Sequence, residues 1–196
     1  MVRPAQLHSN ILYSIIGCIL FSCTQSPQKL IESRKENSSQ IQLQNQKGVL
    51  HWQGQPFTGT LFALYPNQKD TLWTQQYYEG KEHGTWRKFY PEQKLQEIRY
   101  FDNGKKVNTL VGYWANGKKR YEYVFENDEY EGTCRDWNEQ GLLIKEMNYH
   151  KGHEQGEQKV WYDNGKIRTN YIIKNGRRYG LLGTKNCSNV ADSVAR

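Results

Sequence analysis

The sequence predicts an all-β fold made of tandem β-hairpins, joined into an elongated, twisted, single-layer antiparallel meander. One glycine-marked motif recurs at near-constant spacing through most of the chain, and turn-forming residues recur in phase with it. Tyrosine, with 14 residues, outnumbers phenylalanine, with 6, and only 36% of the chain is hydrophobic. Aromatic side chains with a polar tip suit strands that are half buried and half wet. These observations favour β structure with a thin core.

The first 22 residues are predicted to be a signal peptide. Arg3 supplies the positive charge, and the apolar stretch from Ile11 to Phe21 has the length of the central region of such a signal. This stretch is too short to span a bilayer as a helix, which takes about 20 apolar residues. Export followed by processing is therefore expected.

The segment Leu20-Phe21-Ser22-Cys23 resembles a bacterial lipobox. The resemblance implies cleavage before Cys23 and acylation of its thiol, so Cys23 is the predicted lipid attachment site. A second match ends at Cys18, but cleavage there would shorten the apolar region and leave an apolar mature terminus. An ordinary signal peptide, or a retained anchor with Cys23 unmodified, is the alternative.

Residues 23–48 are rich in Gln, Ser, Asn and Lys and are predicted to form a flexible tether. The repeat domain is expected over residues 49–187, followed by a tail at 188–196. Cleavage at Cys23 leaves Cys134 and Cys187 as possible disulfide partners. Two repeats separate them, which in this meander is roughly 19 Å, whereas a disulfide needs Cα atoms within about 7 Å. No intrachain disulfide is expected.

Six anchor positions mark the repeat. They are Gly59, Gly84, Asn108, Gly132, Gly156 and Gly180, separated by steps of 25, 24, 24, 24 and 24 residues. Self-similarity at a fixed period is typical of repeat architectures in which each unit contacts mainly its neighbours. Between the turns lie strand-length segments rich in aromatic and β-branched residues, such as Thr85 to Tyr90 and Leu95 to Phe101. Each unit is therefore predicted to be one hairpin.

Two turns in each unit keep the same phase. Residue types that tolerate a positive φ stand four positions before an anchor, at Gly80, Gly104, Asp128, Gly152 and Gly176. Eight and nine positions after an anchor stand Asn67-Gln68, Glu92-Gln93, Asn116-Gly117, Gln140-Gly141 and Asn164-Gly165. Asn-Gly is the preferred two-residue hairpin turn, with φ > 0 at both central residues. We expect that conformation in the second set.

Two apolar columns are assigned to the core face. They are Leu64, Phe89, Tyr113, Trp137 and Trp161, five residues after an anchor, and Tyr77, Phe101, Phe125, Tyr149 and Ile173, seven before the next. One residue after the first column, and so on the opposite face, stand Tyr65, Tyr90, Trp114, Asn138 and Tyr162. The aromatic members Tyr65, Tyr90, Trp114 and Tyr162 form the candidate binding face. The alternative is cross-strand packing, which stabilises a sheet by about 0.2–1 kcal/mol per pair without a ligand.

The segments Tyr78 to Tyr90 and Gly156 to Lys166 resemble the MORN repeat variant, a degenerate hairpin found in tandem in bacterial proteins that include the YwqK-family antitoxins. The resemblance covers residues 57–183. It implies a MORN-like, elongated, twisted single-layer sheet and a role in interaction rather than catalysis. The chain departs from the pattern at Asn108, which replaces the anchor glycine, and at Asn138, which interrupts the aromatic column.

Charge and motifs argue against several classes of function. The net charge of +7 comes from Lys and Arg interspersed with Glu and Asp, the pattern of a solvated surface, so no nucleic acid partner is expected. His150 and His153 have the spacing of a metal pair but occupy variable turn positions with no third ligand nearby, so no metal is expected. The sequence contains no nucleophile motif, phosphate-binding loop or dinucleotide fingerprint, so neither a cofactor nor an enzymatic activity is expected.

The sequence therefore predicts a non-catalytic, membrane-anchored repeat lipoprotein of the bacterial cell envelope, facing the periplasm. Its predicted partners are the membrane, through the lipid on Cys23, and a protein or envelope polymer bound by a face of the sheet. An antitoxin-like or immunity-type protein of a toxin–antitoxin system is the alternative, and a purely structural envelope protein is a third.

Overall fold

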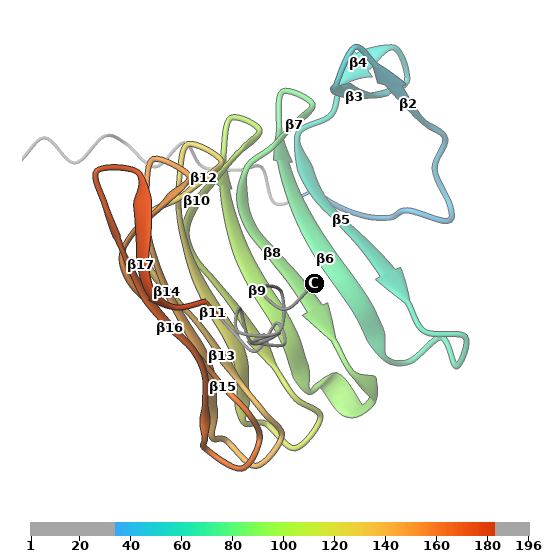
Figure 1. Ribbon diagram of the computed structural model, residues 1–196. Helices are drawn as coiled ribbons and strands as arrows, with labels where there is room; N and C mark the ends of the chain where they lie inside the picture. Colours follow the sequence, from blue (N-terminus) through green and yellow to red (C-terminus); the bar gives the residue numbers. More distant parts are fainter. Residues whose placement is uncertain (1–33, 183–196) are drawn as a thin grey trace, which may run out of the picture. The chain divides into compact units, whose positions relative to one another are not determined.

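Each repeat forms one hairpin of a long open sheet in the computed structural model, which describes residues 34–182 (Figure 1). All of these residues belong to one compact unit, Ile31–Arg196. The strands are β1 (Lys35–Asn37), β2 (Leu43–Gln46), β3 (Val49–Trp52), β4 (Gln55–Pro56), β5 (Gly59–Leu64), β6 (Thr71–Tyr78), β7 (Lys81–Glu82), β8 (Gly84–Phe89), β9 (Leu95–Asp102), β10 (Lys105–Tyr113), β11 (Lys119–Glu126), β12 (Glu129–Tyr130), β13 (Gly132–Trp137), β14 (Leu143–His150), β15 (His153–Trp161), β16 (Ile167–Lys174) and β17 (Arg177–Leu181), with one 3-10 turn, η1 (Pro91–Gln93).

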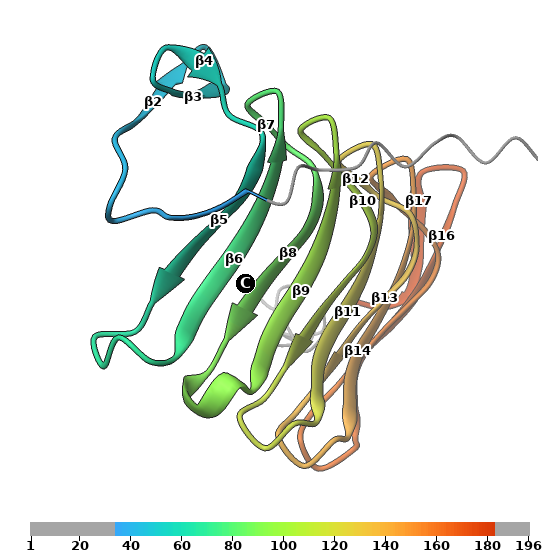
Figure 2. The same ribbon diagram turned by 180° about the vertical axis from the view of Figure 1, so that it is seen from behind.

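The strands of the main sheet follow one another in chain order, β1-β5-β6-β8-β9-β10-β11-β13-β14-β15-β16-β17, with β7 paired to β6 and β12 to β11. Every neighbouring pair from β5 onward is antiparallel, and the view from behind in Figure 2 shows the same succession. The predicted all-β antiparallel meander is confirmed. Between residues 34 and 182, no helix has the length and apolar character required to traverse a bilayer.

The predicted tether does not reach residue 48, because two strands lie within it. β1 pairs in parallel with β5, and β2 joins β3 and β4 in a separate three-stranded sheet. The Thr60 N–H donates to the Arg34 carbonyl at 2.9 Å, and the Lys35 ammonium lies 5.2 Å from the centre of the Phe62 ring. These strands were missed because they are three and four residues long and carry no apolar alternation.

The predicted signal peptide, Cys23, Cys187 and the tail at 188–196 lie outside the described residues.

The two-residue turns with φ > 0 at both central positions lie just before the anchors. Their φ angles are 49° and 76° at Glu79-Gly80, 49° and 85° at Asn103-Gly104, 50° and 73° at Asn127-Asp128, 48° and 74° at Lys151-Gly152, and 51° and 70° at Asn175-Gly176. These are type I′ turns, whose twist matches that of the flanking strands. The prediction of tight turns at these positions is confirmed.

The Asn-Gly loops adopt a different turn from the one expected. In the loop after β10 only Gly117 has a positive φ, 82°. The Gly117 N–H donates to the Trp114 carbonyl at 2.8 Å, and the Trp114 N–H donates to the Lys118 carbonyl at 2.9 Å. This is a type I turn closed by a left-handed residue. The expectation of two positive φ angles was wrong here because Asn116 acts as an acceptor instead, its Oδ1 taking the Lys118 N–H at 2.9 Å.

The four central anchors share a left-handed backbone. Their φ angles are 68° at Gly84, 59° at Asn108, 71° at Gly132 and 73° at Gly156. Asparagine tolerates this conformation better than most other residues with a Cβ. The departure at Asn108 therefore leaves the geometry of the repeat intact.

Replacing Gly156 with alanine is expected to lower the free energy of unfolding by about 1–2 kcal/mol, the cost of a left-handed residue with a Cβ. No atom lies within 4 Å of the added Cβ, so backbone strain alone sets the effect. Gly156→Asn, which copies the residue found at Asn108, is expected to lose clearly less. Urea denaturation measures both; equal losses for the two variants would contradict this account of the anchor.

Each of the five long hairpins contains a bulge at the same repeat position. The register shifts fall between Ala63 and Leu64, Lys88 and Phe89, Gly112 and Tyr113, Asp136 and Trp137, and Val160 and Trp161. In the first hairpin Ala63 pairs with Trp73 and Leu64 with Thr71, so Leu72 is the extra residue. Such bulges increase the local right-handed twist, and their repetition adds to the twist of the sheet.

The two apolar columns lie on opposite faces of the sheet, which corrects the sequence assignment. Tyr77 pairs with Gly59 and Phe101 with Gly84, so this column shares the face of the anchors. Phe89 stands an odd number of residues after Gly84 and so points the other way. We call the face of Tyr77 and Phe101 face A and that of Phe89 face B.

Face A carries the core. The residues of the main sheet with the most buried side chains are Leu61, Phe101, Phe125, Cys134, Met147, Gln158 and Tyr171, and the strand registers place all of them on this face. The rings of Phe57, Tyr77, Trp86 and Phe101 follow one another with centroid separations of 6.1, 5.4 and 4.6 Å. A single-layer sheet thus obtains a core from side chains that lie along one of its faces.

Candidate functional site

The predicted binding residues Tyr65, Tyr90 and Trp114 link successive hairpins. Each donates its side-chain hydrogen bond to a backbone carbonyl in the next hairpin: Tyr65 to Phe89 at 2.8 Å, Tyr90 to Tyr113 at 3.1 Å, and Trp114 to Trp137 at 3.0 Å. The acceptors all belong to the column five residues after an anchor. The polar tips of these three residues are therefore used inside the fold, and alternation from Lys88 places Tyr90 towards face A rather than opposite the core.

Tyr162, the fourth predicted residue, has 42% of its surface exposed, and the Arg168 guanidinium lies 5.9 Å from its ring centre. Asn138 interrupts the aromatic column but keeps the link, because its Nδ2 donates to Asp163 Oδ1 in the next hairpin at 3.2 Å. Its Oδ1 accepts the Leu142 N–H at 2.9 Å. The column thus has a structural role at every position from Tyr65 to Asn138, and its role as a binding face stays a prediction.

Trp114 also borders a cavity of about 500 Å³ at the loop end of the sheet. The cavity is lined by Lys94, Leu95, Tyr113, Trp114, Ala115, Asn116 and Gly117. One face of the indole is covered, because the Arg120 guanidinium lies 4.5 Å from its ring centre. The indole is therefore fixed by its N–H bond to the Trp137 carbonyl and by this cation on one of its faces.

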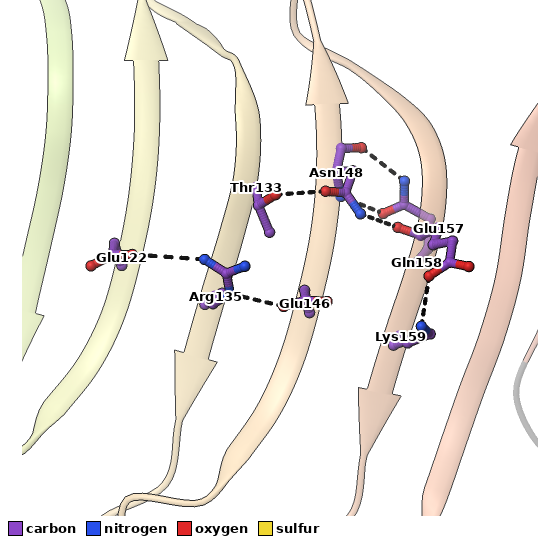
Figure 3. A network of polar contacts seen from close by, with 8 residues as sticks. All are labelled: Glu122, Thr133, Arg135, Glu146, Asn148, Glu157, Gln158 and Lys159. Atoms are coloured by element: carbon purple, nitrogen blue, oxygen red, sulfur yellow. Dashed lines mark hydrogen bonds and ion pairs between the residues drawn. The ribbon is translucent and has the colours of Figure 1, made fainter.

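Face B carries a row of charges that are paired with one another (Figure 3). Glu122, Arg135, Glu146 and Lys159 are cross-strand neighbours on β11, β13, β14 and β15. Arg135 Nε donates to Glu146 Oε2 at 2.8 Å, and its Nη1 lies 3.9 Å from Glu122 Oε1. Lys159 Nζ donates to Glu157 Oε2 at 2.6 Å. Exposed ion pairs of this kind contribute about 0–1 kcal/mol each, and the row presents a nearly balanced surface.

Face A contains a second, differently charged feature, a cleft of about 240 Å³ across β6, β8 and β9. Its lining residues are Trp73, Gln75, Trp86, Arg87, Lys88, Glu97 and Arg99. Trp73, Lys88 and Glu97 form one cross-strand row, since Lys88 is the pairing partner of both of the others. We call this feature the β6–β9 cleft.

The acceptors in the β6–β9 cleft are already occupied. Arg99 Nε donates to Glu97 Oε1 at 2.9 Å, and Tyr121 Oη donates a short hydrogen bond to Glu97 Oε2. Gln75 Oε1 accepts the Tyr77 hydroxyl at 3.2 Å. Both Glu97 oxygens and the Gln75 carbonyl are therefore satisfied within the protein.

Tyr121 reaches Glu97 only because β10 carries a glycine between them. The ring of Tyr121 lies over Gly112, where a Cβ would stand 2.2 Å from Tyr121 Cζ. Burial, together with the hydrogen bond to Glu97, raises the pKa of the Tyr121 hydroxyl well above its ordinary value, so the hydroxyl stays protonated and remains a donor. Any larger residue at 112 would displace the ring and release the carboxylate of Glu97.

In the β6–β9 cleft, hydrogen-bond donors of two side chains and one indole ring have no interaction partner among the described residues. Among the described residues Lys88 Nζ has no ion-pair partner, although Glu97 lies directly across from it. The Gln75 Nε2 donors have no acceptor in the described part of the chain, and the Trp73 ring has no aromatic neighbour there. Trp86 is fixed, because its Nε1 donates to the Gln76 carbonyl at 2.9 Å. The cleft thus contains a half-buried indole without an aromatic or cationic partner among the described residues, beside unpaired donors.

Raising the pH above 10 is expected to destabilise the fold. Burial raises the pKa of Tyr77 and of Tyr149 to about 12, whereas an unfolded tyrosine ionises near its ordinary value of about 10. Their stabilising contribution is therefore complete below pH 10 and is lost as the pH rises to about 12. Urea unfolding at pH 8 and pH 11 measures the effect. The double variant Tyr77→Phe, Tyr149→Phe should show a shallower decline, and an unchanged decline in it would contradict this assignment.

His150 and His153 pair across the turn between β14 and β15. His150 Nδ1 lies 2.9 Å from Glu131 Oε1, in contact with the preceding hairpin. Within residues 34–182 no group of three or more His, Cys, Asp or Glu side chains is arranged to hold a metal. Cys134 is buried and not disulfide-bonded, and burial raises the pKa of its thiol.

Comparison with known proteins gives little further guidance. No family model matches the chain, and neither does any curated protein. Among solved structures, the chain is similar to a crystal structure of an S. aureus TarM mutant in complex with fondaparinux, alpha-GlcNAc-glycerol and UDP. The match has 15% sequence identity and a TM-score of 0.31, and it covers 50% of this chain and 20% of that one. A likeness at this level carries no argument about function.

Proposed function

We propose that this chain is a non-catalytic repeat lipoprotein of the bacterial envelope, of the MORN-variant type, held to the membrane by acylated Cys23. In this proposal the sheet binds an anionic envelope partner through face A. The proposal combines the predicted export signal and lipobox with the hairpin repeat. In it, the strands form the scaffold and the exposed side chains bind the partner.

One observation carries the binding part of the proposal. In the face B row, Arg135 is paired with Glu146 on the neighbouring strand, and Lys159 is paired with Glu157 on its own strand. In the β6–β9 cleft Lys88 is left without a carboxylate partner among the described residues, next to the half-buried ring of Trp73, which has no aromatic partner there. Exposed cations beside an uncovered aromatic face are a common arrangement at binding surfaces. A partner with negative charge would supply what this cleft lacks.

The membrane anchor is tested by labelling the full chain with a palmitate analogue in bacterial cells. Cys23→Ser is expected to abolish incorporation and to remove the protein from the membrane fraction, because no thiol is left at the lipobox. Cys18→Ser is the matched control and should keep both. Label retained in Cys23→Ser would overturn the assignment of the attachment site.

Binding is tested by sedimenting the detergent-solubilised full chain with isolated bacterial envelope polymers. Trp73→Ala is expected to reduce the bound fraction strongly, whereas Trp161→Ala, which removes an indole from face B, should leave it unchanged. Equal retention by the wild-type chain and Trp73→Ala, or equal loss in both variants, would contradict binding through face A.

A further inference from the structure

We propose that the β6–β9 cleft binds a sugar ring that carries an anionic group. This inference rests on the proposed function and specifies its ligand. It derives from three properties of the cleft: its aromatic wall, its content of free hydrogen-bond donors and its size.

The aromatic wall is suited to the flat side of a pyranose ring. Such a ring presents C–H groups on its face, and the electron-rich face of an indole attracts them. Trp73 is half buried on β6 and has no aromatic partner among the described residues, whereas Trp86 is held by Tyr77 and Phe101 at centroid distances of 5.4 and 4.6 Å. Trp73 is therefore the ring available for stacking, and Trp86 is a rigid wall.

The free polar groups of the cleft are donors. Lys88 supplies an ammonium group, and Gln75 supplies the amide hydrogens that its own contacts leave over. The Glu97 carboxylate does not add an acceptor for the ligand, because its two oxygens already accept hydrogen bonds from Arg99 and Tyr121. A ligand that fits must present acceptors. Ring hydroxyls do so, and a carboxylate or other acidic substituent does so more strongly when it meets Lys88.

The size of the cleft favours one ring over an extended peptide. Pockets for drug-sized ligands start at about 300 Å³, and this cleft measures about 240 Å³. β6, β8 and β9 are consecutive in the open sheet, so the rest of a polymer would lie outside the cleft along face A (Figure 1). A single recognised ring within a longer chain is consistent with an envelope polysaccharide.

Titration of the detergent-solubilised full chain with trigalacturonate tests the proposal, with tryptophan fluorescence and calorimetry as readouts. Maltotriose serves as the neutral sugar and a short polyaspartate as an anion without a sugar ring. We expect trigalacturonate to bind at least 10-fold more tightly than either. Trp73→Ala should abolish binding, and Lys88→Gln should weaken trigalacturonate binding at least 10-fold while leaving maltotriose unaffected.

Two controls separate binding from folding. Trp73→Phe keeps an aromatic face and should retain part of the affinity, and Lys159→Gln removes a cation from face B and should change nothing. Trigalacturonate bound equally well by Trp73→Ala, or polyaspartate bound as tightly as trigalacturonate, would overturn the proposal. If none of the three compounds binds but sedimentation with envelope polymers still depends on Trp73, the sugar assignment is rejected and the proposed function stands.

Discussion

Replacing Phe57 with alanine is expected to lower the free energy of unfolding by about 3–5 kcal/mol, the usual loss for a fully buried phenylalanine. Phe57 is 2% exposed and stands between the small sheet and the main one. Its ring lies edge-on to Trp52 and to Tyr77, with centroid distances of 6.3 and 6.1 Å. Its backbone accepts the Gly80 N–H at 2.7 Å. The side chain therefore connects β3 to the first hairpin.

Hydrogen exchange distinguishes this local role from a general loss of core. In Phe57→Ala, amides of β2, β3 and β4 are expected to lose protection first, while those of β13 to β16 keep theirs, because each hairpin contacts mainly its neighbours. Phe89→Ala, at a half-buried position on face B, is the control and should cost less than Phe57→Ala. A uniform loss of protection along the sheet would contradict this view of Phe57.

Replacing Gln158 with alanine is expected to destabilise the fold by about 2–4 kcal/mol, because the N–H and carbonyl of Asn148 and the carbonyl of Gln155, all partly buried, lose their partner. The register shift between β14 and β15 leaves Asn148 without a pairing partner on β15, although it still pairs with Thr133 on β13. Gln158, which is 0% exposed, fills the gap: its Oε1 accepts the Asn148 N–H at 3.0 Å, and its Nε2 donates to the Asn148 carbonyl at 2.8 Å (Figure 3). The side chain takes the place of a missing strand residue.

Gln158→Leu separates hydrogen bonding from packing. Leucine restores much of the lost volume but offers neither donor nor acceptor, so it should be no more stable than the alanine variant. Urea denaturation at neutral pH gives both values. Recovery of wild-type stability by leucine would show that volume, and not the two bonds to Asn148, determines the effect.

The sequence was informative where backbone geometry restricts the choice of residue. Gly80 and Asp128 predicted tight turns because few residue types accept a positive φ. The turn and anchor residues recur every 24 residues because the same backbone positions need a positive φ in each unit, and this spacing gave the number and order of the hairpins. The asparagine at 108 is consistent with this restriction, since it adopts a φ of 59°.

Prediction failed where the outcome depended on contacts between repeats. The strand register determines that Phe89 lies on face B, and a column of apolar residues in the sequence does not reveal that register. The hydrogen bonds of Tyr65 and Tyr90 to the next hairpin use atoms that a sequence pattern cannot locate. Lys88 and Trp73 stood at positions that vary from repeat to repeat, and this departure from the repeat was the one available signal for the cleft. Gln158 gave no signal, because a polar residue in a strand is normally exposed.

The parallel strand β1 covers part of the first edge of the main sheet. A regular antiparallel edge at β5 would offer its free backbone groups to any extended chain and invite stacking of one molecule on another. Here that edge is taken by the three residues Lys35–Asn37, with charged side chains at two of them. A segment that the sequence suggested was a spacer thus covers residues 60–62 of this edge with a strand that is itself short and charged, the kind of edge that disfavours pairing with another chain.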